Sequence, residues 1–271
     1  MEMRHIVLMV CTWLLVAVAQ GAQVDTVRVY SPSMKKQVPV VVVEPNKKKP
    51  HMPVVYLLHG YSDSYKSGWI NKVEGITTYA DRYNCLLVMP DGGFSSWYFD
   101  SPEDKTYRYE TFVAGELVSY IDSHYPTLAT ANGRAIAGNS MGGHGAWFLA
   151  LRHPNVFGAA GSMSGGVNLC PFSKQFDIAL RLGSYEEHPQ RWADYSVVNV
   201  VEHASKPYPA LIMSCGNDDF FYQENVKLHE KLLRLGIAHY FISSPGNHSW
   251  QYWTQALQYQ MVFFNEFFHN K

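Results

Sequence analysis

Runs of residues that are apolar along their whole length recur through this chain and alternate with segments of helical periodicity. The apolar runs are rich in β-branched residues and are bounded by proline or glycine, which is typical of buried β-strands. They cover residues 38–45, 53–60, 85–93, 134–138, 156–166, 210–216 and 239–246. A strand that is apolar on both sides needs helices against both of its faces, so the pattern predicts an α/β fold with a mostly parallel sheet.

Helices are predicted between these strands, where apolar residues return every three or four positions. They cover residues 69–83, 112–124, 141–153 and 222–235, and an aromatic helix ends the chain. The first strands follow one another with no helix between them, so the sheet is expected to begin with antiparallel pairing. With 47% hydrophobic residues in the chain, residues 23–271 can bury one substantial core and are predicted to form a single domain.

The first 22 residues have the pattern of an export signal. Arg4 precedes an apolar run over residues 6–19, which ends in the tripeptide AVA at 17–19. The run is too short to span a bilayer comfortably, and A-x-A is the form of a signal-peptide cleavage site. We expect cleavage at about residues 19–22 and export to the periplasm or the extracellular space, without stable membrane insertion afterwards. An uncleaved anchor is the alternative.

The charge, the cysteines and the histidines of the chain bear, in turn, on nucleic-acid partners, disulfides and metals. The formal net charge of -1 argues against a nucleic-acid partner. After the signal, the cysteines are Cys85, Cys170 and Cys215. An odd number in so long a chain does not indicate a disulfide framework, so buried thiols are expected. The histidines are scattered and form no zinc-binding motif, so neither a metal nor another cofactor is expected.

The segment IAGNSMGGHG, residues 136–145, places Ser140 among glycines where a strand meets a helix. Gly138 and Gly142 complete a G-x-S-x-G pattern, in which the turn is so tight that only glycine fits around the serine. Such a turn holds the hydroxyl out at the edge of the sheet, where the helix dipole favours negative charge. Ser140 is therefore predicted to be a nucleophile.

A nucleophilic serine needs a base and a carboxylate that orients the base, in the chain order serine, acid, histidine for this kind of sheet. Asp218 and Asp219 follow the strand at 210–216, and His248 follows the strand at 239–246. Taken singly, the aspartates could be turn or helix-capping residues, and His248 a surface histidine. Their shared position beyond the carboxyl ends of parallel strands, in the required order, favours a Ser–His–Asp triad.

Two backbone amides are expected to form an oxyanion hole. One is the N–H of Met141, directly after the nucleophile, and the other is the N–H of Tyr61, which follows Gly60 in the loop LLHGYSDS. His59 could be mistaken for the base. It precedes the serine in the chain, so a role in shaping this loop is expected for it instead.

Seven motifs resemble, in order, the esterase D-like family of α/β-hydrolases, which includes S-formylglutathione hydrolases, acetylxylan and feruloyl esterases, short-chain esterases and mycolyltransferases. They are LLHGYSDS, MPDGGFSSWY, YETFVAGELVSYIDSHYP, GNSMGGHGA, GSMSGG, CGNDDFFYQEN and PGNHSWQYW, and they span nearly the whole mature chain. The resemblance implies the α/β-hydrolase fold, with Ser140 as nucleophile and His248 as base. The family's acid lies three residues after the glycine that closes the preceding strand, which implies Asp219, with Asp218 as the alternative.

The chain departs from the family pattern at two places. Family members often have Gly-Gly-His-Asp around the base, where this chain has GNHS at residues 246–249. Leu or His is common at the position of Asn139. Neither departure removes a catalytic group, but both could change the shape of the pocket or the surroundings of the base.

Aromatic residues near the predicted site bear on which ester is cleaved. Trp97 and Tyr98 follow one strand end, and Trp250 follows the base. If exposed, their rings could stack on a sugar or a phenolic acyl group; packing beneath the loops is the alternative. With export, the family resemblance implies an esterase that removes feruloyl or acetyl groups from xylan-type oligosaccharides. A general short-chain esterase or a thioesterase like S-formylglutathione hydrolase is the main alternative, and a non-catalytic carbohydrate-binding protein or an acyltransferase has less support.

Overall fold

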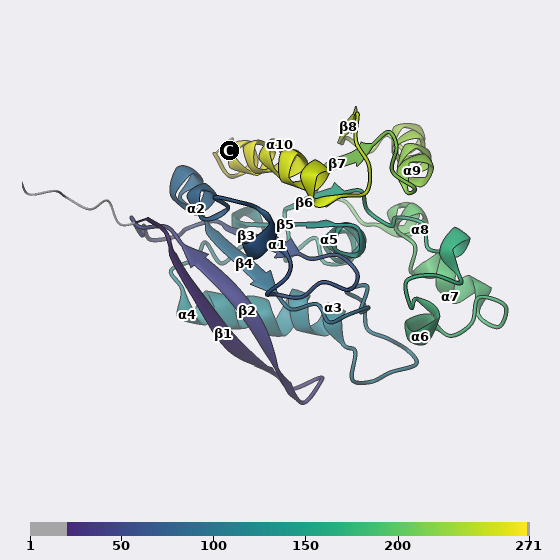
Figure 1. Ribbon diagram of the computed structural model, residues 1–271, viewed down its shortest axis with the longest axis horizontal. Helices are drawn as coiled ribbons and strands as arrows, with labels where there is room; N and C mark the ends of the chain where they lie inside the picture. Colours follow the sequence, from purple (N-terminus) through teal and green to yellow (C-terminus); the bar gives the residue numbers. More distant parts are fainter. Residues whose placement is uncertain (1–20, 270–271) are drawn as a thin grey trace, which may run out of the picture.

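Eight strands form one central sheet in the computed structural model, which describes residues 21–269 (Figure 1). The strands are β1 (Gln23–Ser31), β2 (Lys36–Glu44), β3 (Val54–Leu58), β4 (Leu86–Pro90), β5 (Arg134–Asn139), β6 (Ala159–Met163), β7 (Ala210–Gly216) and β8 (Tyr240–Ser244). Their order across the sheet is β1-β2-β4-β3-β5-β6-β7-β8. β2 is antiparallel to both β1 and β4, and every later pair is parallel. The predicted mostly parallel sheet with an antiparallel start is confirmed.

Helices cover both faces of the sheet (Figure 1). They are α1 (Trp69–Lys72), α2 (Thr77–Tyr83), α3 (Tyr109–Thr111), the π-helical η1 (Phe112–Leu117), α4 (Val118–His124), the short η2 (Ala131–Gly133), α5 (Met141–Arg152), the short η3 (Cys170–Phe172), α6 (Ala179–Leu182), α7 (Pro189–Asp194), α8 (Val197–His203), α9 (Tyr222–Arg234) and α10 (Trp250–His269). α4, α5, α8 and α9 bury apolar residues against one face, and α1, α2 and α10 do so against the other.

The central strand β3 shows why its sequence is apolar throughout. Val54, Tyr56 and Leu58 belong to the core under α5, whereas Val55 and Leu57 belong to the core under α10. Because successive side chains of a strand point to opposite faces, a strand covered on both sides has no position left for a polar residue. The strands are therefore apolar along their whole length because helices pack against both faces of the sheet.

Three segments differ from the prediction. The helix expected over residues 69–83 is two short helices, because Gly75 adopts φ 70° between α1 and α2. β1 was not predicted, since it is an edge strand whose residues are mostly exposed and whose apolar residues form no continuous run. The stretch between β6 and β7 contains α6, α7 and α8, which are too short to show a clear helical period.

None of the helices in residues 21–269 is both long enough and apolar enough to cross a membrane. The predicted signal peptide lies outside the described residues, apart from Gly21 and Ala22.

Candidate active site

Ser140 occupies a strained turn between β5 and α5. Its backbone has φ 54° and ψ -117°, a conformation that residues other than glycine rarely adopt and that is concentrated at functional sites. A Cβ atom on Gly138 would lie 2.4 Å from the carbonyl carbon of Gly142, and one on Gly142 would lie 2.2 Å from the carbonyl oxygen of Leu58. The glycines around the serine therefore allow the turn to press against β3, as the sequence pattern predicts.

A chain of hydrogen bonds connects Ser140, His248 and Asp219. Ser140 Oγ lies 2.9 Å from His248 Nε2, and His248 Nδ1 lies 2.8 Å from Asp219 Oδ2 and 3.0 Å from Oδ1. Because the carboxylate can only accept, Nδ1 carries the proton and Nε2 is free to accept the serine hydroxyl proton. The Asp219 side chain is fully buried, and the backbone N–H of Phe221 donates to its Oδ1 at 2.8 Å.

These three side chains meet because the strands before them run parallel. β5, β7 and β8 end at the same edge of the sheet, and the loops after them carry Ser140, Asp219 and His248. The loops after β7 and β8 are also tied to each other, since the N–H of Asp218 donates to the carbonyl of Gly246 at 2.9 Å. The Asp218 side chain is exposed. Asp219, and not Asp218, is the carboxylate that contacts His248.

The amides of Tyr61 and Met141 are available to a ligand. Within residues 21–269, neither N–H donates to another group of the protein. Gly60 brings the first of them close to the turn, since a Cβ atom there would lie 3.4 Å from the Cβ atom of Ser140. Two unpaired amides beside a serine hydroxyl are the donors that an oxyanion requires.

His59 is engaged at both ring nitrogens and is not free to act as a base. Its Nε2 accepts the N–H of Gly92 at 2.8 Å, so the proton is on Nδ1, which donates to the carbonyl of Gly60 at 2.8 Å. Burial lowers the pKa of His59 and keeps the ring neutral. The residue joins the loop after β3 to the loop after β4, which fits the expected role in shaping the loop.

Of the two alternatives for Trp97 and Tyr98, packing beneath the loops is confirmed and exposure to a substrate is wrong. Both are buried, with 1% and 0% of their surfaces exposed. The indole N–H of Trp97 donates to the carbonyl of Phe176 at 3.1 Å, and the hydroxyl of Tyr98 donates to the carbonyl of His59 at 3.1 Å. Trp250 is half-buried and packs edge-on against Trp69, with ring centroids 5.1 Å apart. These residues support the loops of the site from beneath.

Two other rings are exposed at the site. Phe94 and Phe220 each have 52% of their surface exposed. The ring of Phe220 lies 4.2 Å from that of His248, and the ring of Phe94 lies 5.0 Å from that of Tyr61. Phe176 connects the two sides, at 5.9 Å from Phe220 and 5.7 Å from Tyr61. An aromatic surface thus runs from the predicted oxyanion amide to the histidine.

The residue after Phe176 also reaches this surface. Asp177 accepts the hydroxyl of Tyr61 at 3.1 Å, and burial together with this hydrogen bond raises the pKa of Tyr61. Both Phe176 and Asp177 have φ near 55°, so this segment is held in an unfavourable conformation by its contacts. No periodic pattern marks the segment in the sequence, whereas Phe220 could have been proposed because it directly follows Asp219.

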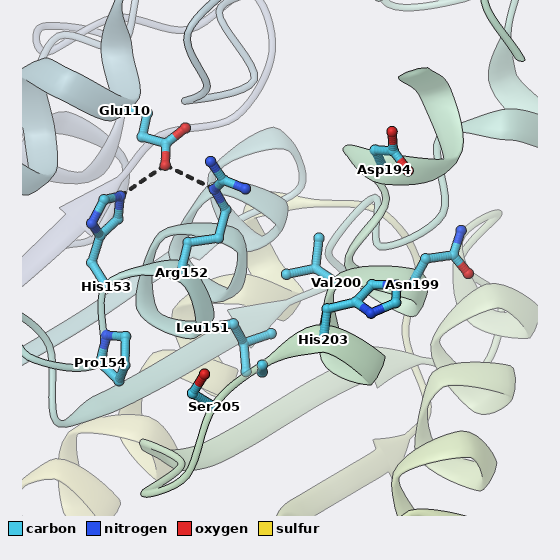
Figure 2. A pocket seen from close by; sticks show the side chains of 11 residues that line it. Glu110, Leu151, Arg152, His153, Pro154, Asp194, Asn199, Val200, His203 and Ser205 are labelled. Carbon is cyan, nitrogen blue, oxygen red and sulfur yellow. Dashed lines mark hydrogen bonds and ion pairs between the residues drawn. The ribbon is translucent and has the colours of Figure 1, made fainter. Parts of the chain in front are cut away.

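A hollow of about 460 Å³ is lined by residues at the C-terminal end of α5 (Figure 2), whereas Ser140 precedes the N-terminal end of that helix. A helix of this length spans about 18 Å. The lining of the hollow includes Glu110. The Oε1 atom of Glu110 accepts hydrogen bonds from Arg152 Nε and His153 Nε2, both at 2.8 Å. One oxygen of the carboxylate is thus engaged by two side chains, and the described lining lacks the predicted site residues. This hollow is therefore not where the predicted chemistry takes place.

Glu110 is expected to stabilise the fold in a pH-dependent way. Burial alone would raise the pKa of this carboxyl, but the hydrogen bonds from His153 and Arg152 outweigh it and the net pKa is lowered. The stabilisation is therefore complete above the ordinary pKa of 4.5 and is lost as the pH falls through the lower folded value. We expect Glu110→Gln to reduce the free energy of unfolding by about 2 kcal/mol at pH 7 and by progressively less below pH 4.5.

Urea unfolding of both proteins between pH 7 and pH 3 measures this difference. Glu103→Gln is the control, since Glu103 pairs with Arg191 at the surface, with 42% and 28% of the two side chains exposed, and such pairs contribute little. A deficit of Glu110→Gln that stays constant down to pH 3 would contradict the linkage.

Comparisons with known proteins agree with this architecture. A sequence model of the Putative esterase family matches residues 31–264. The chain is 27% identical over 252 residues to an acetyl esterase of Caldicellulosiruptor saccharolyticus, covering 84% of this chain and 92% of that protein. It is also similar to the solved structure of a ferulic acid esterase, with a TM-score of 0.78 at 27% identity over 92% of this chain and 100% of that one. The Staphylococcus aureus serine hydrolase FphF has the same fold, with a TM-score of 0.80 at 22% identity over 91% and 99% of the two chains. The predicted α/β-hydrolase fold is confirmed.

Proposed function

The chain belongs to the Putative esterase family of carboxylic ester hydrolases, and from that premise we propose that it is an exported serine esterase that removes acetyl or feruloyl groups from xylan-type oligosaccharides. The observation that carries the proposal is the hydrogen-bonded chain of Ser140, His248 and Asp219 beside two unpaired amides. We assign Ser140 as nucleophile, His248 as general base and Asp219 as the group that orients it, within one catalytic domain over residues 23–271.

Acylation follows from this geometry. His248 Nε2 takes the proton of the Ser140 hydroxyl, 2.9 Å away, as Oγ attacks the ester carbonyl. The carbonyl oxygen becomes an oxyanion that accepts the N–H groups of Tyr61 and Met141. His248 then gives its proton to the alcohol oxygen, the carbon–oxygen bond of the ester breaks, and the acyl group remains on Ser140.

Deacylation uses the same groups in reverse. A water molecule takes the place of the departed alcohol, and His248 removes its proton as the water oxygen attacks the acyl carbon. The second oxyanion collapses, Ser140 recovers its proton from His248, and the free acid leaves. Asp219 stays ionised throughout and holds the imidazole in the tautomer with the proton on Nδ1, which both half-reactions require.

Two observations support the proposal that the acyl group is acetyl or feruloyl. The relatives include proteins described as acetyl esterase and ferulic acid esterase. The exposed rings of Phe94 and Phe220 offer apolar surface beside the serine to a planar phenolic group or to the apolar face of a sugar. These two rings take the place of Trp97 and Tyr98 in the argument for aromatic recognition.

Release of acetate and ferulate from acetylated and feruloylated xylo-oligosaccharides tests the substrate. The protein is assayed in parallel on p-nitrophenyl acetate, which reports ester hydrolysis without requiring a sugar. Release of either acid from the oligosaccharides supports the proposal and identifies the acyl group. Cleavage of p-nitrophenyl acetate alone would leave a short-chain esterase and remove the xylan assignment.

A further inference from the structure

The imidazole of His248 is enclosed by three aromatic rings. Phe220 lies closest, with ring centroids 4.2 Å apart and planes inclined by 37°. Trp253 of α10 and Phe221 meet the imidazole nearly at right angles, at 4.8 Å and 5.4 Å. Phe220 is itself stacked with Phe176, at 5.9 Å and 16°, which restricts the rotation of its ring. The closest and flattest of the three contacts thus belongs to Phe220.

We propose that Phe220 is a positioning residue that stabilises the imidazolium form of His248 during the reaction. The inference rests on the proposed esterase function, in which His248 becomes positively charged as each oxyanion forms. A cation within about 6 Å of an aromatic centroid is attracted by the ring quadrupole, whereas the neutral imidazole gains little. The contact therefore strengthens as the transition state is approached, which is the condition for raising kcat rather than binding alone.

The other groups around His248 do not depend on Phe220. Asp219, from the loop after β7, is the charged group in direct contact with the ring, and the Ser140 hydroxyl faces Nε2. Cys215 of β7 and Tyr252 of α10 interact electrostatically with Asp219, but burial raises the pKa of both, so both are neutral. Their effect on the imidazolium is the same in every Phe220 variant.

The pH dependence of kcat/KM on p-nitrophenyl acetate tests the proposal. Phe220→Leu covers the imidazole with a similar apolar volume but lacks a ring. We expect it to move the midpoint of the acidic limb to lower pH by about 0.5 to 1 unit. We also expect kcat to fall by roughly 3- to 10-fold with KM little changed. Phe220→Trp, which has the stronger quadrupole, is expected to move the limb to higher pH.

Phe94→Leu is the matched control. Phe94 is exposed to the same extent, 52%, and its ring contacts Tyr61 instead of His248. The acidic limb of this variant should coincide with that of the wild type. A limb that shifts equally in Phe94→Leu and Phe220→Leu would overturn the proposal.

Two further outcomes of Phe220→Leu would also overturn it. A limb that does not move means that the ring only packs, and a limb that moves to higher pH means that it acts by excluding water from the imidazole. NMR titration of the His248 ring protons in a Ser140→Ala background measures the same shift without turnover. The proposal therefore remains testable even if the wild type cleaves no ester, an outcome that would refute the esterase function separately.

Discussion

Replacement of Ser140 by alanine is expected to lower kcat on any ester substrate by roughly 10⁴- to 10⁶-fold. In the proposed mechanism the hydroxyl oxygen is the attacking atom, and it lies 2.9 Å from His248 Nε2. Alanine would leave only the two amides and the binding surface to assist a water molecule. Initial rates on p-nitrophenyl acetate, with enzyme in large excess for the variant, measure the loss. The fold should be unaffected, since only one oxygen is removed.

Ser164→Ala provides the control for this experiment. Ser164 lies in the neighbouring segment GSMSGG, is buried, and has φ 50°, so it shares the burial and backbone strain of Ser140. Its N–H donates to the carbonyl of Ser214, away from His248. We expect kcat to change by less than about 3-fold. Equal activity of Ser140→Ala and the wild type would remove Ser140 as the nucleophile.

Asp219→Asn is expected to lower kcat by about 10⁴-fold with little change in fold. The asparagine can present its amide N–H₂ to Nδ1 of the imidazole, which stabilises the tautomer with the proton on Nε2 and prevents that nitrogen from accepting the serine proton. The substitution also replaces the negatively charged carboxylate by a neutral amide, so the imidazolium is no longer stabilised by an opposite charge. Steady-state kinetics at pH 7 to 8 measure this loss.

The neighbouring aspartate makes this prediction specific. Asp218→Asn alters an exposed side chain one residue away, and its backbone N–H still donates to the carbonyl of Gly246. We expect kcat within about twofold of the wild type. If Asp218→Asn were as inactive as Asp219→Asn, the loss would report damage to the loop after β7, and Asp219 would lose its assigned role.

The positions of the three groups could be predicted because they depend on rules that act locally and on chain topology. A buried strand followed by a polar loop marks a carboxyl end, and parallel strands bring such ends to one edge. Ser140, Asp219 and His248 each follow such a strand. Choosing Asp219 over Asp218 from the residues alone was not possible, because the direction of a side chain in a loop depends on contacts such as the Phe221 N–H bond to its carboxylate.

The exposure of aromatic residues could not be predicted in this way. Tyr98 is buried because Gly145 of α5 leaves room for it: a Cβ atom there would lie 2.6 Å from the Cβ atom of Tyr98. Trp97 is buried under Phe176, which lies about 80 residues later in a stretch without a regular pattern. The composition of a loop tells which rings are present, whereas their burial depends on distant partners.

The reactive groups are distributed unevenly across the sheet. Ser140 follows β5, a strand buried at every position between β3 and β6, whereas His248 follows β8, the half-exposed last strand. Edge elements open locally at a lower free energy than central ones. We therefore expect His248 to separate from Ser140 in a local opening that leaves the centre of the sheet intact, so that the working lifetime of the protein depends on its edge strand more than on its global stability.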